Sequence, residues 1–244
     1  MKRSKLAAVI FVNVSLLSSA TFAHVSLKGE DMPVEVRAPY NWTGFYAGLN
    51  AGAVQHTMNI TDIQAATFNA TIQQVTNPAF TGGFQLGYRH QLDLTKASGV
   101  YGLEFSGNFS NATFNSQYGT AFTLYNLSAQ NALKNLFLLQ LIGGVAAERT
   151  LLFLAAGLSW TNITGGMTNL DGVPFFTSLS VNKKVIGTSV GAGIEYAFTD
   201  KISARVKLDV ITPKAYFTSD NVGNSYQISN SILQGTFGVN YKFG

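Results

Sequence analysis

The chain has 244 residues, a length that suits one domain, and only 11% of them are charged, whereas ordinary soluble domains have about 25%. This composition excludes the charged surface that a water-soluble protein needs, and 24 glycines with 18 phenylalanines indicate an exterior that does not face water. The net charge of +4 does not predict nucleic-acid binding, because most of the excess lies within the first five residues.

Residues 1–23 have the three parts of a secretory signal peptide: a basic start, an apolar centre (Leu6–Leu17) and small residues before a predicted cleavage after Ala23. The apolar centre is shorter than the roughly 18 residues expected of a spanning helix. Beyond it the chain has 13 basic and 12 acidic residues, a net charge of +1. Residues 24–40 carry charges and two prolines and are predicted to form an extended periplasmic leader.

From residue 41 onward, apolar residues alternate with small or polar ones, the period-2 pattern that predicts β-strands. The first such segment is NWTGFYAGLNAGAV, residues 41–54. The pattern recurs in five further segments: Gly82–Arg89, Tyr101–Ser110, Ile186–Phe198, Ile202–Val210 and Leu233–Phe243.

The stretch NLFLLQLIGGVAAERTLLFLAAGLSW (residues 135–160) is apolar except at a few positions, among them Glu148 and Arg149. Neither half is long enough for a spanning helix, but a β-strand crosses a bilayer with about 9–11 residues. We therefore predict a hairpin of Leu136–Ala146 and Leu151–Trp160, which brings the total to eight strands. Even strand numbers are the rule for single-chain bacterial barrels.

The predicted connections differ in length at the two ends of the strands. Ala147–Thr150 and Phe198–Lys201 are short, and His90–Ser98 is intermediate. The longer ones are rich in Asn, Thr, Ser and Gln: Asn59–Pro78, Asn111–Lys134, Thr161–Lys183 and Thr218–Gln227. This layout predicts that residues 41–244 form an all-β, eight-stranded antiparallel transmembrane barrel with four longer extracellular loops and short periplasmic turns.

A water-soluble eight-stranded carrier would turn its apolar face inward, and its exterior would then be mostly Gly, Ser and Asn. Such an exterior is poor cover for a soluble protein, and Phe, Leu, Tyr and Val would crowd into a narrow bore, so the lipid-facing arrangement is favoured. A closed barrel also satisfies every backbone hydrogen bond, as lipid demands. The end of the chain adds a signal. In TFGVNYKF, the residues Thr236, Gly238, Tyr241 and Phe243 match the C-terminal sorting pattern that the barrel-assembly machinery reads, although Gly244 follows where that pattern usually ends.

The chain resembles the small opacity-type, OmpA-like outer-membrane β-barrels, which include surface antigens of Gram-negative bacteria, some of them haemin-binding. Three segments carry the resemblance: NWTGFYAGLNAG (41–52), GVAAERTLLFLAAGLSW (144–160) and GAGIEYAFTDKISARVKLD (191–209). The resemblance implies a structural surface protein of the outer membrane, a porin-like barrel whose loops mediate adhesion or envelope interactions. The fourth strand departs from the family, because Gln140 is its only inward polar candidate, which argues against a continuous aqueous channel.

Six charged residues are predicted to point into the barrel, three of each sign: Arg89, Glu104, Glu195, Arg205, Lys207 and Asp209. Glu195 and Arg205 are equally spaced from Asp200, so we expect them to face each other across the last short turn. The favoured interpretation is a plug of ion pairs, since buried charges require partners and side chains just fill an eight-stranded bore. The alternative is a gate that opens when the pairs exchange, as in a small channel for ions or solutes.

No catalysis, metal or obligatory cofactor is predicted, because His24, His56 and His90 lie apart from any Ser/His/acid set. His56, predicted at the entry to a loop, is the one candidate for a haem or metal ligand, and a haem- or lipid-binding barrel stays an alternative. The polar loops contain six aromatic residues: Phe114, Tyr118, Phe122, Tyr125, Phe175 and Phe176. The favoured interpretation is that these rings pack on one another or lie at the lipid rim, and the alternative is that they are contacts for a host or envelope ligand.

Overall fold

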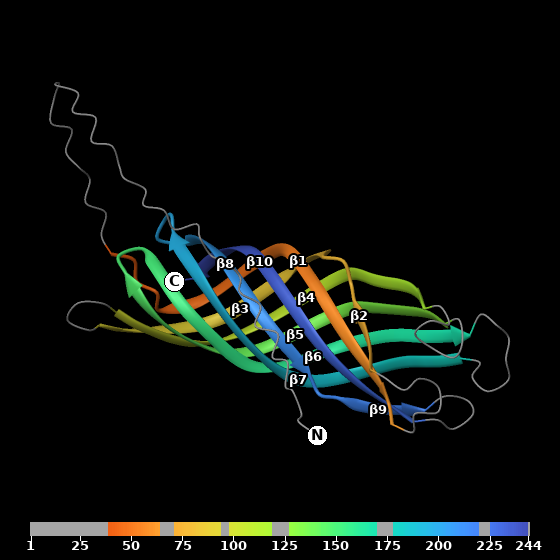
Figure 1. The fold of residues 1–244 in the computed structure, drawn as a ribbon. Helices are drawn as coiled ribbons and strands as arrows, with labels where there is room; N and C mark the ends of the chain where they lie inside the picture. The colour runs from red at the N-terminus through yellow and green to blue at the C-terminus, as the bar shows by residue number, and fades with distance from the viewer. Residues whose placement is uncertain are drawn as a thin grey trace, which may run out of the picture. The chain divides into compact units, whose positions relative to one another are not determined.

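The computed structural model describes residues 39–63, 71–93, 98–118, 127–169, 178–219 and 225–243, and every regular element within these ranges is a β-strand. The strands are β1 (Gly44–Asp62), β2 (Thr71–Val75), β3 (Ala79–Asp93), β4 (Ser98–Tyr118), β5 (Leu127–Ala147), β6 (Thr150–Asn169), β7 (Ser178–Ala197), β8 (Ile202–Pro213), β9 (Tyr216–Ser219) and β10 (Ser225–Phe243) (Figure 1). Within the described part of the chain, no helix is long and apolar enough to cross a membrane.

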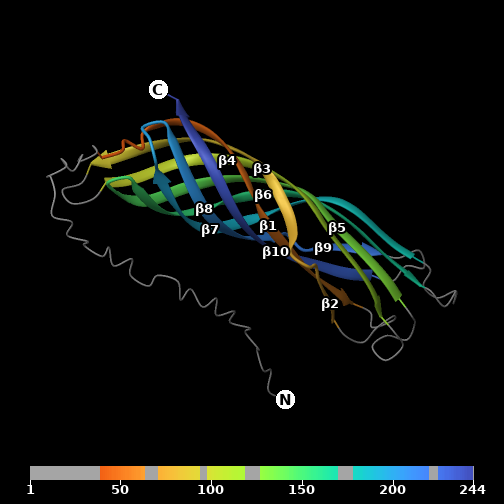
Figure 2. The same cartoon turned by 90° about the horizontal axis from the view of Figure 1, so that it is seen from above.

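The strands close into a barrel, because β1 pairs with β3 on one side and with β10 on the other (Figures 1 and 2). The order around the barrel is β1, β3, β4, β5, β6, β7, β8 and β10, and every pair is antiparallel. Where the eight strands pair around the full circle there is no sheet edge, so their backbone hydrogen bonds are satisfied within the barrel wall. The predicted eight-stranded antiparallel barrel is therefore confirmed.

β2 and β9 prolong this wall at the end where the longer connections lie. β2 pairs with β1 beyond β3, and β9 pairs with β10 beyond β8. A proline marks each interruption, Pro78 just before β3 and Pro213 at the end of β8, because proline has no N–H for the ladder. Thr76 bridges the first interruption: its amide donates to the His56 carbonyl at 2.8 Å, and its hydroxyl accepts from the His56 amide at 2.8 Å.

The strands are longer than predicted, and the predicted loops were wrong over much of their length. β4 continues to Tyr118 and β5 begins at Leu127, so most of 111–134 is strand; β6 and β7 likewise occupy most of 161–183. The physical reason is that a strand that leaves the lipid is solvated on its outer face and keeps its ladder, so polar residues do not end it. The four remaining connections at this end lie outside the described residues.

We call this the loop end, and the end with the Glu148–Arg149 connection the turn end; short turns are periplasmic and longer loops extracellular in such barrels. Between the two ends the barrel exterior is apolar. On β6, for example, Leu152, Leu154 and Leu158 are exposed. At the turn end, exposed aromatic rings form a girdle: Phe45, Tyr88, Tyr101, Tyr196, Phe198, Tyr241 and Phe243. An apolar band with an aromatic girdle is the exterior of a transmembrane barrel.

Hydrogen exchange tests the prolonged strands. We expect the backbone amides of residues 162–167 in β6 to exchange as slowly as those of residues 152–158, because all of them pair with β5 and with β7. Deuterium uptake followed by mass spectrometry in detergent micelles would measure both segments in one sample. Exchange of 162–167 as fast as in a free peptide of the same sequence would contradict the strand assignment.

Candidate functional site: the barrel interior

The interior of the barrel is filled by side chains in three layers. An apolar layer at the turn end consists of Tyr40, Trp42, Val100, Ile142, Ala146, Leu151, Phe153, Ala155 and Ala197. A second apolar layer toward the loop end consists of Val54, Ala112, Leu133, Leu136, Leu138, Ile163, Val185, Ile211 and Ile232. Polar and charged side chains lie between them: on β5, for example, Gln140 stands between Ile142 and Leu138.

The polar layer contains all six charged residues that the alternation predicts to be inward: Arg89, Glu104, Glu195, Arg205, Lys207 and Asp209. Each side chain is at most 4% exposed, and the charges sum to zero. Their partners lie across the bore as well as on neighbouring strands. This layer is therefore a network of buried ion pairs that extends across the bore.

Glu104 of β4 is the centre of the network. The Tyr46 hydroxyl donates to its Oε2 at 2.6 Å, the Arg205 guanidinium forms a two-pronged ion pair with both oxygens, and Lys207 Nζ lies 3.3 Å from Oε1. One carboxylate thereby joins β1, β4 and β8. Such charge-assisted hydrogen bonds are the strong ones in a region without water.

Two further clusters complete the layer. Arg89 forms an ion pair with Glu195 at 2.7 Å, and the Asn240 amide donates to the other oxygen of Glu195 at 2.9 Å. Lys207 Nζ donates to Gln140 Oε1 at 2.5 Å and lies 3.4 Å from Asp209 Oδ2. The Gln140 amide in turn donates to Asp209 Oδ1 at 2.9 Å.

Glu195 and Arg205 lie opposite each other in the register of β7 and β8, but neither is the other's ion-pair partner. Glu195 reaches Arg89 on β3, and Arg205 reaches Glu104 on β4. Spacing along the chain predicts neighbours in the wall correctly. It does not predict contacts across the bore, because these depend on how far each side chain extends.

Glycines make room for the large side chains of the network. A Cβ atom at Gly87 would lie 2.4 Å from the Tyr46 hydroxyl oxygen, and one at Gly193 would lie 2.5 Å from Phe153 Cζ. Neither distance leaves space for a larger residue without displacing the ring. The alternation of small and large inward residues therefore lets large side chains fit within this narrow bore.

Residues just before β1 close the turn end. The Tyr40 amide donates to the Glu148 carbonyl at 3.1 Å, and the Trp42 amide donates to Gln91 Oε1 at 2.8 Å. The two rings meet edge to face at 4.6 Å, and Trp42 is 3% exposed. Burial raises the pKa of Tyr40 to about 12, so its phenol is neutral at physiological pH.

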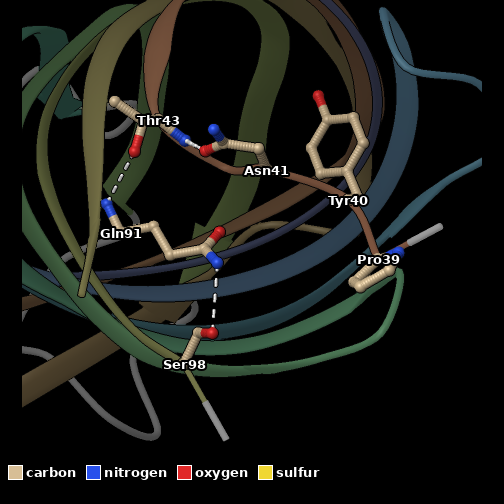
Figure 3. Close-up of a pocket in the computed structure, with 6 residues that line it drawn as sticks. All are labelled: Pro39, Tyr40, Asn41, Thr43, Gln91 and Ser98. Atoms are coloured by element: carbon tan, nitrogen blue, oxygen red, sulfur yellow. Dashed lines mark hydrogen bonds between the residues drawn. The ribbon is translucent and has the colours of Figure 1, made fainter. Parts of the chain in front are cut away.

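Behind this cap, the space between Trp42 and the Arg89–Glu195 pair has a volume of only about 10 Å³, no more than one water molecule needs. A larger cavity of about 310 Å³ lies on the outer side, lined by Pro39, Tyr40, Asn41, Thr43, Gln91 and Ser98 (Figure 3). Its polar groups bond mainly to one another, as in the contact of Gln91 Nε2 with the Ser98 hydroxyl at 3.1 Å. The sequence pattern did not predict the cap, because Tyr40 was assigned to the extended leader and Trp42 to the first strand segment, whereas β1 begins at Gly44.

The remaining predicted residues fall into two groups. In the sorting pattern, Thr236 and Gly238 face the bore, whereas Tyr241 and Phe243 belong to the aromatic girdle. Of the aromatic loop candidates, Phe114 and Tyr118 lie in β4 rather than in a loop. The others lie outside the described residues: Phe122, Tyr125, Phe175 and Phe176.

His56 was wrongly predicted to lie at the entry to a loop. It lies within β1, is 1% exposed, and its Nε2 is 2.9 Å from Asn230 Oδ1 inside the barrel. The error arose because β1 continues to Asp62. A ring enclosed in this way is not available to haem at the surface. Among the described residues, no group of three or more His, Asp or Glu side chains is placed to hold a metal ion.

The closed barrel, its apolar exterior and its filled interior define the class: the protein is a β-barrel of the bacterial outer membrane. It is similar to the 31 kDa outer-membrane immunogenic protein of Brucella melitensis, with 25% identity over 247 residues, covering 92% of this chain and 96% of the relative. No family model matches the chain.

The chain is also similar to two solved structures of outer-membrane proteins. The N-terminal β-barrel domain of Pseudomonas aeruginosa OprF is 17% identical with a TM-score of 0.39, covering 84% of this chain and 99% of that one. The outer-membrane protein OprG of the same organism is 10% identical with a TM-score of 0.49, covering 85% and 99%.

The Glu104→Gln variant tests the importance of the network. Removing the negative charge leaves Arg205 and Lys207 buried without their main counter-charge, so we expect the free energy of unfolding to fall by about 3–5 kcal/mol. Urea titration followed by the heat-dependent shift of the folded band on a gel would measure it.

Asp200→Asn is the matched control, because it breaks the Arg149–Asp200 ion pair, in which Asp200 is 90% exposed. We expect its urea midpoint to stay close to that of the wild type. If the two variants had equal midpoints, the buried network would not be what stabilises the barrel.

Proposed function

We propose that the protein is a structural surface barrel of the opacity type, with a closed bore and with its interactions at the loop end. The observation that carries the proposal is the filled interior: two apolar layers enclose a neutral ionic layer. A structural barrel needs no conduction path, and the proposed role includes no reaction and no cofactor. The apolar exterior of the barrel would be in contact with outer-membrane lipid.

The layers argue against the alternative of a small channel. An ion that entered the bore would have to shed its water against Trp42 at one end and against residues such as Leu138 at the other. Exchange of partners between the Arg89–Glu195 and Arg205–Glu104 pairs would leave both apolar layers in place. A gate formed by the ion pairs alone therefore has no open state.

The loop end supports a role in contact with the surroundings. β4, β5, β6 and β7 continue beyond the apolar band toward the connections at the loop end. Loops on a rigid barrel commonly carry recognition. We propose that aromatic side chains in these connections bind host or envelope components. Residues 1–23 would direct export, the part of residues 24–40 that precedes Tyr40 would remain in the periplasm, and Thr236–Phe243 would be read by the barrel-assembly machinery.

Conductance in a planar bilayer tests the closed bore. We expect folded wild-type protein to give no steady current steps, and Glu195→Ala to give none either, because the apolar layers remain in that variant. Folding would be checked beforehand by the heat-dependent gel shift. Salt-dependent steps from the wild type would make the protein a pore, and steps from Glu195→Ala alone would favour the gate.

Cell attachment tests the loop end. We expect the double variant Phe175→Ala and Phe176→Ala, displayed on bacteria, to bind epithelial cells at least about fivefold less than the wild type, as for loss of interface hot spots. The control is Leu152→Ala with Leu154→Ala, which also shortens two exposed apolar side chains but on the lipid-facing wall. Equal attachment of all three proteins at equal surface abundance would reject a role for these aromatic residues.

A further inference from the structure

The outer surface of three neighbouring strands changes from apolar to polar at one common level. In register across β5, β6 and β7 there is first an apolar row and then a polar row, toward the loop end. The apolar row is Phe137, Trp160 and Ile186, and the polar row is Asn135, Asn162 and Lys184. Because Trp is enriched where the membrane meets water, the two rows mark the outer boundary of the lipid.

A surface cavity of about 360 Å³ lies between these rows, and all six side chains line it. We call it the Lys184 cavity. Its volume falls within the range of small-molecule sites, about 300–1,000 Å³. Further aromatic rings adjoin the apolar side of the cavity on the lipid-facing wall. Phe137 stacks on Phe105 with 6.1 Å between the ring centroids, and it meets Phe109 edge to face with 6.2 Å between the centroids.

On the polar side of the cavity, Asn162 and Lys184 have polar groups that could bind a ligand. Asn162 Oδ1 is buried and has no hydrogen-bond partner among the described residues. Lys184 is exposed and forms no ion pair within the described part of the chain. The adjacent Lys183 differs, because its Nζ donates to the Phe217 carbonyl at 2.9 Å and lies 5.0 Å from the Tyr216 ring.

These features require a ligand with three chemical properties. An anion would pair with Lys184, and an N–H or O–H donor would satisfy the side-chain oxygen of Asn162. Acyl chains would pack on the aromatic rings of Trp160 and Phe137. All three must meet at the boundary between lipid and water. A soluble anion lacks the acyl chains, and an acyl chain alone satisfies neither polar group.

We propose that the Lys184 cavity binds the headgroup of an acylated, phosphorylated sugar lipid in the outer leaflet. Its phosphate contacts Lys184, a hydroxyl or amide N–H of the sugar donates to Asn162 Oδ1, and an acyl chain lies over Trp160 and Phe137. The binding is independent of whether the bore is closed, so it does not rest on the proposed structural role.

The probe is lipid A, a doubly phosphorylated, acylated glucosamine disaccharide, added to the purified protein in micelles of a neutral detergent. Binding is followed by tryptophan fluorescence. Of the two tryptophans, Trp42 is buried at the turn end and Trp160 lines the cavity, so the signal reports on the proposed site. We expect a saturable change with one lipid per barrel.

We expect Lys184→Gln to raise the dissociation constant about fivefold, the effect of one lysine at an anionic lipid surface, and Lys184→Arg to keep it near the wild-type value. The control Lys201→Gln makes the same change at an exposed lysine of the turn end and should have no effect. The folded band on a gel confirms that each variant is intact. Lipid A without its phosphates should not distinguish Lys184→Gln from the wild type.

Three results would overturn the proposal. Equal affinity of the wild type and Lys184→Gln for lipid A would remove Lys184 from the site. Displacement of lipid A by millimolar inorganic phosphate would make the site one for a soluble anion. Equal binding of phosphatidylglycerol, whose glycerol headgroup also carries hydroxyl donors, would show that a sugar headgroup is not required.

Discussion

The narrowness of an eight-stranded bore is the constraint on which the rest of the structure depends. Side chains from opposite walls touch, so an inward charge cannot be solvated and must find a counter-charge across the bore. Glu104 is an example. Its carboxylate accepts hydrogen bonds from Tyr46 of β1 and from both Arg205 and Lys207 of β8. Gly87 is small for the same reason, since the Tyr46 ring occupies the space above it.

The layered order of the interior follows from this constraint. Ion pairs are stronger where the effective dielectric constant is low, and here an apolar layer lies on each side of the ionic layer. At the turn end the bore is covered by residues that precede β1. The centroid of the Trp42 ring lies 5.7 Å from Arg89 Cζ, and the Tyr40 amide donates to the Glu148 carbonyl in the connection between β5 and β6. Tyr40 and Trp42 are therefore part of the folded barrel and not only of a linker.

Much of this architecture could be predicted from the sequence, because alternation with a period of two identifies both the strand and its inward face. Gln140 and Lys207 could be placed inside in this way. Their partners could not, since contacts across a bore depend on side-chain length and strand stagger. The ends of the strands could not be predicted either, because the polar residues that follow Trp160 mark the end of lipid contact and not the end of β6. His56 was misplaced for the same reason.

The closed interior and the exposed cavity on the wall are two consequences of one rigid structure. Val185, whose neighbours Lys184 and Ile186 face the cavity, points inward into the loop-end apolar layer. Leu136 holds β5 in the same way between Asn135 and Phe137. The floor of the cavity is thus fixed by packing on its inner side, and a ligand need not order it on binding. Packing that fills the interior of the barrel therefore also preorganises the proposed binding surface on its outside.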